Sequence, residues 1–290
     1  QTDEYLVMKY MLARCILNGN ITPVQVPALS ADNAVSIATV FNETAMNLEF
    51  QSNKFNMSGV TTHTPMDEQY LITTTAFRST MNMNVLAAAY NIEYAELMGR
   101  IINVDSFVDM DWDRLELLFT DENGNVDPSF EEWDETDESI LEGVPAVAVS
   151  VDFWQIWDNF EKMTENYNGK GLYWNYNYHV WKTFSVSPFA QAVCYTATTG
   201  SITSVSVTPT AATLPTGADL EIAVSVSRTG VINKAVEWSI SGNESTGTYV
   251  SDAGKVHIAK DETATTVTVK ATSVADATKS ATCAITVSNS

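Results

Sequence analysis

Apolar side chains in the first two hundred residues recur either every three to four positions or at every second position. The first spacing is typical of helices with one buried face, and the second is typical of strands. Helices are predicted at residues 2–17, 31–45, 85–98 and 153–163. Thr2, Ser30 and Asp152 stand at the expected N-caps, where a side-chain oxygen accepts a hydrogen bond from a free backbone N–H.

Strands are predicted at residues 70–74, 100–104, 115–119, 144–151, 172–180 and 189–195. Residues 144–151 form an apolar run broken only by Ser150, which is typical of a strand buried on both faces. Aromatic residues occupy alternate positions of 172–180, so this strand should have one aromatic face. The pair Asn123-Gly124 is typical of a hairpin turn.

The composition changes at Gly200. After it aromatic residues are almost absent, and short runs of alternating Val and Ile lie between turn residues. Repeated short strands of this kind are typical of a β-sandwich. We therefore predict two domains, an α+β domain over residues 1–200 and an all-β sandwich over residues 201–290.

The net charge of −21 belongs almost entirely to the first domain. Residues 1–200 hold 28 acidic and 9 basic residues, a net charge of −19, whereas residues 201–290 hold 8 and 6, a net charge of −2. Such a surface repels nucleic acid and anionic membranes. This argues against a protein that reads DNA, but not against a container for DNA.

Residues 105–142 hold fifteen of these acids and one base, Arg114. A glycosidase needs two carboxylates at a set separation, and the candidates are Asp109, Asp111, Glu116, Glu131, Glu132 and Glu135. Asp121, Asn123 and Asn125 match the start of a calcium loop, but Val126 stands where that loop needs glycine. So many acids make both patterns nonspecific, and we expect a solvated acidic loop without a catalytic, cofactor-binding or metal site.

A second candidate site is a group of aromatic residues. They are Trp154, Trp157, Tyr173, Trp174, Tyr176, Tyr178 and Trp181. A sugar-stacking platform is one interpretation, but aromatic residues on alternating faces favour a core or a subunit interface. His63, His179 and His257 lie on different elements, and His179 is expected to be packed and hydrogen-bonded. Without a nucleophile and base set, we do not expect an enzyme.

Cys15, Cys194 and Cys283 have no paired spacing, which predicts three buried free thiols and synthesis in a reducing compartment. No apolar run is long enough to cross a bilayer. The chain begins with Gln1 rather than Met, so we expect that a preceding part has been removed.

Residues 201–289 resemble a group 2 bacterial Ig-like module. The resemblance is carried by Val205-x-Val207-x-Pro209, Thr213-Leu214, Gly217, Val236-x-Trp238, Gly254-x-Val256 and the closing segment 281–287 (ATCAITV). It implies that Trp238 fills the core of the domain. The domain is then a spacer or decoration, and the sharper hypothesis is a weak contact with glycans of the host surface.

The first domain resembles the major capsid proteins of small short-tailed phages that infect Gram-positive bacteria. The motifs are 85–91 (VLAAAYN), 99–105 (GRIINVD), 146–154 (AVAVSVDFW), 167–175 (YNGKGLYWN), 179–184 (HVWKTF) and 187–190 (SPFA). The resemblance implies the Hong-Kong-97-type shell fold. The N-terminal arm and extended loop that precede the long helix in that fold have no counterpart here.

The resemblance also implies a function. The chain would be a major capsid protein, made in the host cytoplasm, that assembles with itself into hexamers and pentamers of an icosahedral virion shell. It would enclose double-stranded DNA without binding it specifically, with scaffolding and portal proteins as partners, no cofactor, no membrane contact, and the Ig-like domain projecting outward. The alternatives are a cell-surface or phage-tail glycan-binding protein with an Ig-like spacer, and a carbohydrate-active enzyme.

Overall fold

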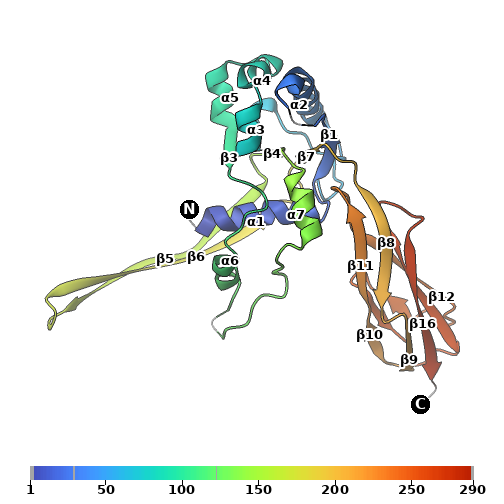
Figure 1. Ribbon diagram of the computed structural model, residues 1–290. Helices are drawn as coiled ribbons and strands as arrows, with labels where there is room; N and C mark the ends of the chain where they lie inside the picture. Colours follow the sequence, from blue (N-terminus) through green and yellow to red (C-terminus); the bar gives the residue numbers. More distant parts are fainter. Residues whose placement is uncertain (1–2, 29, 122, 289–290) are drawn as a thin grey trace. The chain divides into compact units, whose positions relative to one another are not determined.

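The computed structural model describes residues 3–28, 30–121 and 123–288, and its internal contacts divide the chain into two compact units (Figure 1). Unit 1 comprises residues 1–15 and 26–197. Unit 2 comprises residues 16–25 and 198–290, so it includes a short N-terminal segment that no pattern in the sequence indicated. No helix in the described part of the chain is long and apolar enough to cross a membrane.

Unit 1 combines helices with one central sheet and one long hairpin. Its helices are α1 (Asp3–Leu17, of which the last two residues group with unit 2), α2 (Ala34–Glu49), α3 (Thr75–Thr80), α4 (Met83–Ala89), α5 (Tyr94–Arg100), α6 (Trp112–Leu118), α7 (Glu135–Glu142) and the 3₁₀ turns η1 (Ala31–Asn33) and η2 (Met66–Glu68). Its strands are β2 (Gln69–Thr74), β3 (Ile101–Val104), β4 (Ala146–Ser150), β5 (Trp154–Asn168), β6 (Tyr173–Val186) and β7 (Ala192–Thr196).

Strand β4 lies at the centre of the sheet. It pairs antiparallel with β7 on one side and with β2 on the other, and β2 pairs parallel with β3. All five residues of β4 are buried, which confirms the strand predicted at 144–151. A strand with neighbours on both edges and cover on both faces has no position left for a polar, solvated side chain.

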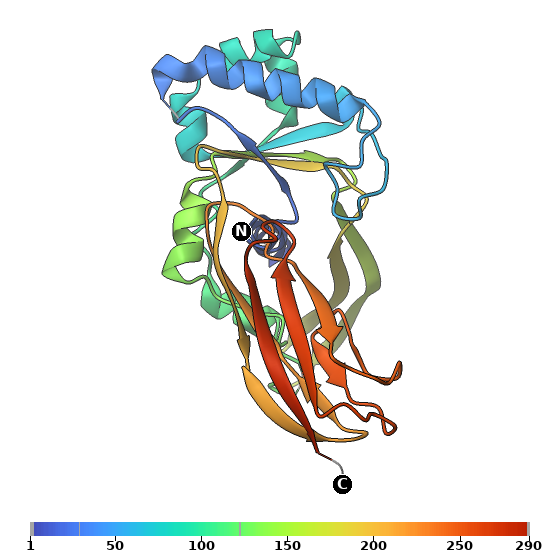
Figure 2. The same cartoon turned by 90° about the vertical axis from the view of Figure 1, so that its right-hand side faces the viewer.

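Helix α2 lies along the sheet of unit 1 (Figure 2). Its buried residues follow the spacing of one helical face: Ile37, Ala38, Phe41, Thr44, Ala45 and Leu48. The ring of Phe41 stacks on Tyr195 of β7 with centroids 3.7 Å apart, and on Phe77 of α3 at 5.5 Å. These three rings join α2, α3 and β7 into one core.

Several local predictions were wrong. Of residues 115–119, predicted as a strand, 115–118 belong to helix α6 and Phe119 is its C-cap; in this helix Leu115 turns inward and packs with Leu6 and Tyr10 of α1. The helix predicted at 85–98 is two helices, α4 and α5, with Asn91 at a positive φ of 54° between them. Ser30 makes no side-chain capping hydrogen bond, and Thr2 lies outside the described residues.

The largest error concerns residues 153–163, which were predicted to be helical. From Trp154 onward they lie in β5, a strand of fifteen residues that pairs with β6 along almost its whole length. A β-bulge between Asp158 and Phe160 shifts the register by one residue. The shift breaks the alternation of apolar residues, which then resembles a helical pattern, and long-range pairing overrides that local signal.

Unit 2 consists of strands apart from the last two residues of α1 at its N-terminal end. Its strands are β1 (Thr22–Gln25), β8 (Ser201–Thr208), β9 (Ala211–Pro215), β10 (Asp219–Glu221), β11 (Ala223–Thr229), β12 (Val236–Ser241), β13 (Tyr249–Val250), β14 (Lys255–His257), β15 (Thr266–Ser273) and β16 (Ser280–Ser288). From β8 onward they pair in the orders β12-β15-β16-β9, β10-β14-β13 and β11-β8. Alternate residues of β15 and β16 are buried, as expected for strands with one face on a core.

One hydrophobic core joins the three sheets of unit 2. Val207, Val256, Val269 and Ile285 belong to it, and Trp238 packs against it while remaining partly exposed. Cys283 also lies in this core, and Cys15 and Cys194 are buried in unit 1. All three cysteines are free and buried, which confirms that prediction.

Candidate functional site: an exposed aromatic hairpin

The hairpin of β5 and β6 projects from the rest of unit 1 (Figure 1). With fifteen residues in β5 and the rise of about 3.3 Å per residue in a strand, it is about 50 Å long. The structure pairs each strand with the other alone. An isolated two-stranded hairpin is at best marginally stable in water, and among the described residues no further strand extends this one.

The two faces of the hairpin differ. Residues paired directly across antiparallel strands share a face, and the pairs Met163–Tyr178, Glu165–Tyr176 and Tyr167–Trp174 therefore place four aromatic rings and a methionine on one face. We call Met163, Tyr167, Trp174, Tyr176, Tyr178 and Val180 the aromatic stripe. Each of them exposes between 42% and 63% of its surface.

The opposite face is polar toward the tip. The pairs Lys162–His179, Thr164–Asn177 and Asn166–Asn175 lie there, and Asn175 donates a 2.9 Å hydrogen bond to the side chain of Asn166. Tyr173 beside the turn and the pair Phe160–Trp181 toward the base lie on this face too. The aromatic stripe is therefore continuous, whereas the opposite face is mixed. The prediction of a strand with one aromatic face is confirmed, although the face lies open rather than in a core.

Near its base the hairpin is held by ion pairs and by a buried aromatic side chain. The ammonium of Lys182 lies 2.7 Å from the Glu4 carboxylate of α1 and 3.2 Å from that of Asp158. Both contacts raise the pKa of Lys182. Phe153, directly before β5, is completely buried. The base is therefore anchored, and the distal half is free.

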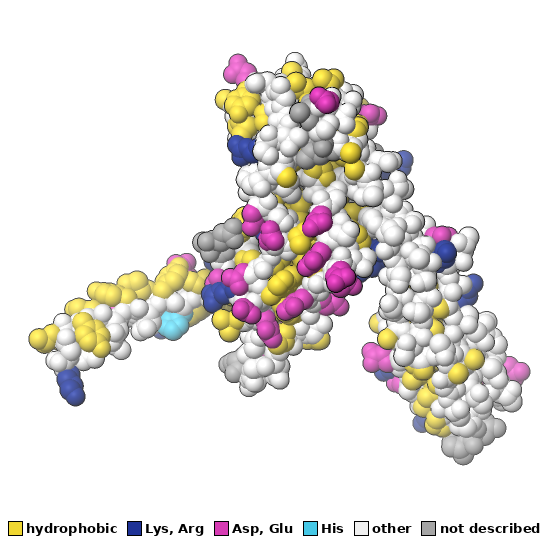
Figure 3. Space-filling view, in the orientation of Figure 1, with side chains coloured by type: hydrophobic (Ala, Val, Ile, Leu, Met, Phe, Trp, Pro, Cys, Tyr) yellow, Lys and Arg dark blue, Asp and Glu magenta, His cyan; other side chains and the backbone are white. Residues whose placement is uncertain are grey.

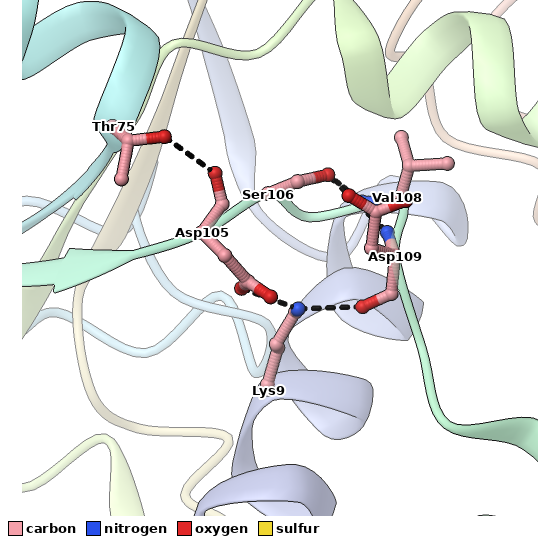
Figure 4. Close-up of polar contacts among 6 residues, drawn as sticks. All are labelled: Lys9, Thr75, Asp105, Ser106, Val108 and Asp109. Atoms are coloured by element: carbon pink, nitrogen blue, oxygen red, sulfur yellow. Dashed lines mark hydrogen bonds and ion pairs between the residues drawn. The ribbon is translucent and has the colours of Figure 1, made fainter. Parts of the chain in front are cut away.

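The acidic segment, residues 105–142, is fastened to helix α1 rather than forming a loose loop. Lys9 of α1 is almost completely buried, and its ammonium donates 2.6 Å hydrogen bonds to the Asp105 carboxylate and to the Asp109 carbonyl (Figure 4). The Ser106 hydroxyl in turn accepts hydrogen bonds from the backbone N–H groups of Val108 and Asp109. Burial works against the ionised form of Asp105, but the hydrogen bond and charge of Lys9 and the backbone N–H groups of Ser106 and Asp105 together outweigh it and lower its pKa.

The next residue of α1, Tyr10, provides a second anchor. The Tyr10 hydroxyl donates to the Glu131 carbonyl at 3.1 Å and accepts from the Glu131 N–H at 3.0 Å. Its ring stacks on Trp133 with centroids 5.2 Å apart. Both ends of the segment are thus held, and most of its carboxylates point to solvent (Figure 3).

The candidate acids have different structural roles along the segment. The backbone carbonyls of Asp109 and Glu131 accept the hydrogen bonds from Lys9 and Tyr10. The Asp121 carboxylate accepts hydrogen bonds from the backbone N–H groups of Asn123 and Asn125. These bonds lower the pKa of Asp121. Within residues 3–28, 30–121 and 123–288, no three His, Cys, Asp or Glu side chains are grouped so as to hold a metal ion.

The histidines are dispersed. His63 is exposed, and His257 lies 2.6 Å from the Asp219 carboxylate in unit 2. His179 stands exposed on the polar face of the hairpin, so the expectation that it is packed was wrong.

The anchors of the acidic segment were not recognised from the sequence, although a lysine within the apolar pattern of residues 2–17 was a signal for a buried ion pair.

The comparison with protein families identifies the family of this chain. The family model described as "Phi29-like phage major capsid protein" matches residues 1–196, most of the chain. The chain belongs to the Phi29-like phage major capsid protein family. Membership favours the shell hypothesis over a glycan-binding protein or a carbohydrate-active enzyme, since the family is one of structural proteins.

Individual relatives extend the similarity into unit 2. The major capsid proteins of Bacillus phages PZA and B103 are each 28% identical to this Phi29-like chain, over 277 and 280 residues and 94% of the chain. These alignments cover 54% of each relative, so the chain spans about half the length of the curated relatives it matches. A solved capsid structure of Staphylococcus phage Andhra is similar over 68% of this chain and 60% of its own, with 15% identity and a TM-score of 0.46. A similarity that weak supports no argument about the fold.

Proposed function

We propose that this Phi29-like chain is a subunit of a phage head that assembles with copies of itself into an icosahedral virion shell around double-stranded DNA. On this proposal unit 1 forms the shell with a Hong-Kong-97-type fold, and residues 201–290 form an Ig-like domain that projects outward. A scaffolding protein and a portal would be its partners. DNA would be enclosed without specific binding, because the net charge of −19 over residues 1–200 repels phosphate.

The observation that carries the proposal is the aromatic stripe. With 150–250 Å² for each aromatic side chain and about half of it exposed, the four rings present roughly 400 Å² in one strip, to which Met163 and Val180 add. That lies within the range of the largest apolar patch on an ordinary monomer, a patch that is often functional. A repeated subunit contact explains why the stripe is exposed, and closed symmetric assembly sums many modest contacts of this kind.

The experiment measures association of the purified chain by sedimentation velocity and electron microscopy. In the test variant the stripe is made polar on β6: Trp174→Ser, Tyr176→Ser and Tyr178→Ser. The matched control carries Asn166→Ser, Asn175→Ser and Asn177→Ser on the opposite face of the same hairpin. We expect the unaltered chain and the control to associate and the stripe variant to remain monomeric.

Two results would contradict the proposal. The first is an unaltered chain that remains a monomer over a wide range of concentration and salt. The second is a stripe variant that associates as strongly as the control while hydrogen exchange shows the core strand β4 equally protected in both.

A further inference from the structure

The hairpin of β5 and β6 leaves an outer backbone edge on each of its two strands. Among the described strands, β5 and β6 pair with each other alone, so alternate residues of each strand direct their N–H and C=O groups away from the hairpin. Such an edge is a template for pairing with a strand of another chain. Two strands are marginal in water, whereas three or more with an apolar face form a stable sheet.

Strand β5 carries the features that discourage pairing at an edge. A bulge interrupts it between Asp158 and Phe160, and Asp158, Glu161, Lys162 and Glu165 place four charged side chains along it. Bulges and charged side chains are the means by which natural edge strands stay unpaired. We therefore expect the outer edge of β5 to remain solvated.

The outer edge of β6 has none of these features over residues 173–181. This stretch of nine residues contains no Lys, Arg, Asp, Glu or Pro, and all nine residues are exposed. Its register with β5 is uninterrupted from Tyr173 to Trp181. A long, exposed and uncharged edge is the kind on which another strand pairs.

The side chains of this edge are ordered symmetrically about Asn177. Residues directly opposite each other in antiparallel strands share a face, so a second β6 paired about Asn177 brings apolar residues opposite apolar ones and polar residues opposite polar ones. The pairs are Tyr173 with Trp181, Trp174 with Val180, Asn175 with His179, and Tyr176 with Tyr178, and Asn177 lies opposite its own counterpart. Aromatic pairs of this kind stabilise a sheet. The edge of β6 therefore complements itself about a two-fold axis.

We propose that two copies of the chain pair the outer edges of their β6 strands, antiparallel and about a two-fold axis at Asn177, into a four-stranded sheet β5-β6-β6-β5. This inference rests on the proposed function and names the contact through which one aromatic stripe meets another. Both stripes lie on the same face of that sheet, where the rings nearest the axis cover one another in part. The occupant is a second copy, because the side-chain order of the edge matches its own reversal.

The arrangement also keeps the acidic side chains of the two copies apart. Glu161 and Glu165 lie on β5, the outer strand of each hairpin. Three strand spacings separate the two β5 strands, a distance of about 14 Å. That exceeds the Debye length of about 8 Å at physiological ionic strength. Two stripes packed face to face would instead press these carboxylates against apolar rings of the other copy, and the loss of water would disfavour their ionised form.

The first test places a charge at the axis. Asn177→Lys should weaken association of the full chain about tenfold at low salt, because two ammonium groups then meet across the axis. The matched control is Thr164→Lys, since Thr164 pairs directly with Asn177 on the same face but lies on β5. The control should associate like the unaltered chain in sedimentation velocity, and hydrogen exchange should show β4 equally protected in both variants.

The second test restores the contact with the opposite charge. Asn177→Asp should weaken association as Asn177→Lys does, because two carboxylates then meet. An equal mixture of the two variants should associate again, since each lysine meets an aspartate across the axis. A mixture that associates no better than either variant alone would contradict the pairing of Asn177 with its own counterpart.

The third test locates the axis by cross-linking. All three native cysteines are buried, so Asn177→Cys supplies one exposed thiol in each copy. A thiol-reactive cross-linker shorter than about 10 Å should join two copies through position 177, but it should not join two copies of Thr164→Cys, whose thiols are three strand spacings apart. Equal cross-linking of both variants would contradict the proposed register.

The outcomes separate this inference from the proposed function. If the unaltered chain associates and depends on the stripe, but Asn177→Lys associates equally well, the β6 contact is wrong and the shell proposal stands. In that case another surface of the chain covers the stripe, or the edge of β6 accepts a strand from a different protein. If the unaltered chain does not associate at all, both proposals are overturned.

Discussion

The ammonium of Lys9 lies 2.6 Å from the Asp105 carboxylate, and the lysine side chain is almost completely buried while the aspartate is half exposed. This pair joins the middle of α1 to the first residue of the acidic segment. A buried charge that loses its partner is strongly destabilising, so the pair decides whether the segment stays on α1.

We expect Asp105→Ala to lower the free energy of unfolding of unit 1 by about 2–3 kcal/mol, because it leaves the Lys9 ammonium buried with one acceptor, the Asp109 carbonyl. Denaturant titration measures the change. The control is Arg114→Gln, which breaks the exposed pair with Asp3 and should cost clearly less, because an exposed ion pair contributes little to stability. Equal effects in both variants would contradict the role assigned to Lys9.

The pair also predicts a dependence on pH. The folded pKa of Asp105 is lowered, so its contribution is complete above the ordinary Asp value of about 3.9 and is lost as pH falls through the lowered folded value. The difference in stability between the unaltered chain and Asp105→Ala should therefore shrink on acidification. A difference that stays constant down to pH values below that range would show that the carboxylate charge is not what stabilises the segment.

Tyr10 provides a separate test of the second anchor. Tyr10→Phe keeps the ring against Trp133 but removes the bonds to the Glu131 backbone, which should cost about 1–2 kcal/mol. Tyr10→Leu should cost more, since the stacking is lost as well. Hydrogen exchange of peptides within residues 123–134 should rise in that order, whereas peptides from β4 should keep their protection.

In unit 2 the Glu262 carboxylate is a buried acceptor. Burial raises its pKa, but bonds from the Thr248 hydroxyl and from the backbone N–H groups of Ala264, Glu244 and Ser245 outweigh this and lower the value to about 2. The resulting stability is present above the ordinary Glu pKa and is lost as pH falls toward about 2.

Glu262→Gln should therefore destabilise unit 2 at neutral pH by about 1–3 kcal/mol, because an amide accepts fewer of these bonds. Its effect should diminish in acid. The exposed Glu237→Gln is the control. Thermal unfolding followed by hydrogen exchange of residues 201–288 gives the readout, and a pH-independent difference between the two variants would contradict this account.

Gly254 tests the close packing around Trp238. Its φ of 79° is one that other residues rarely adopt, and a Cβ there would lie 2.7 Å from the Ile222 carbonyl and 2.8 Å from the Trp238 ring. We expect Gly254→Ala to cost about 1–3 kcal/mol. Gly124→Ala, at a φ of 82° with open space around it, separates backbone strain from the clash. Similar costs at both positions would show that packing on Trp238 contributes little.

The sequence by itself determined the elements whose hydrophobic pattern is local and continues over many positions. The buried strand β4 follows from an uninterrupted apolar run, α2 from a regular helical face, and the acidic character of unit 1 from composition. The aromatic face of β6 follows from simple alternation, and the free cysteines follow from their spacing.

Only the tertiary structure decided those features that depend on contacts between residues far apart in the chain. Leu115 lies in a helix because it meets Tyr10, more than a hundred residues earlier, and residues 153–163 extend because β6 supplies their hydrogen bonds across a bulge. Whether an aromatic face is buried or open is likewise set by what lies opposite it. The alternation of residues shows that a face is apolar, but burial needs a second surface opposite it, and no described residue of unit 1 covers the aromatic stripe.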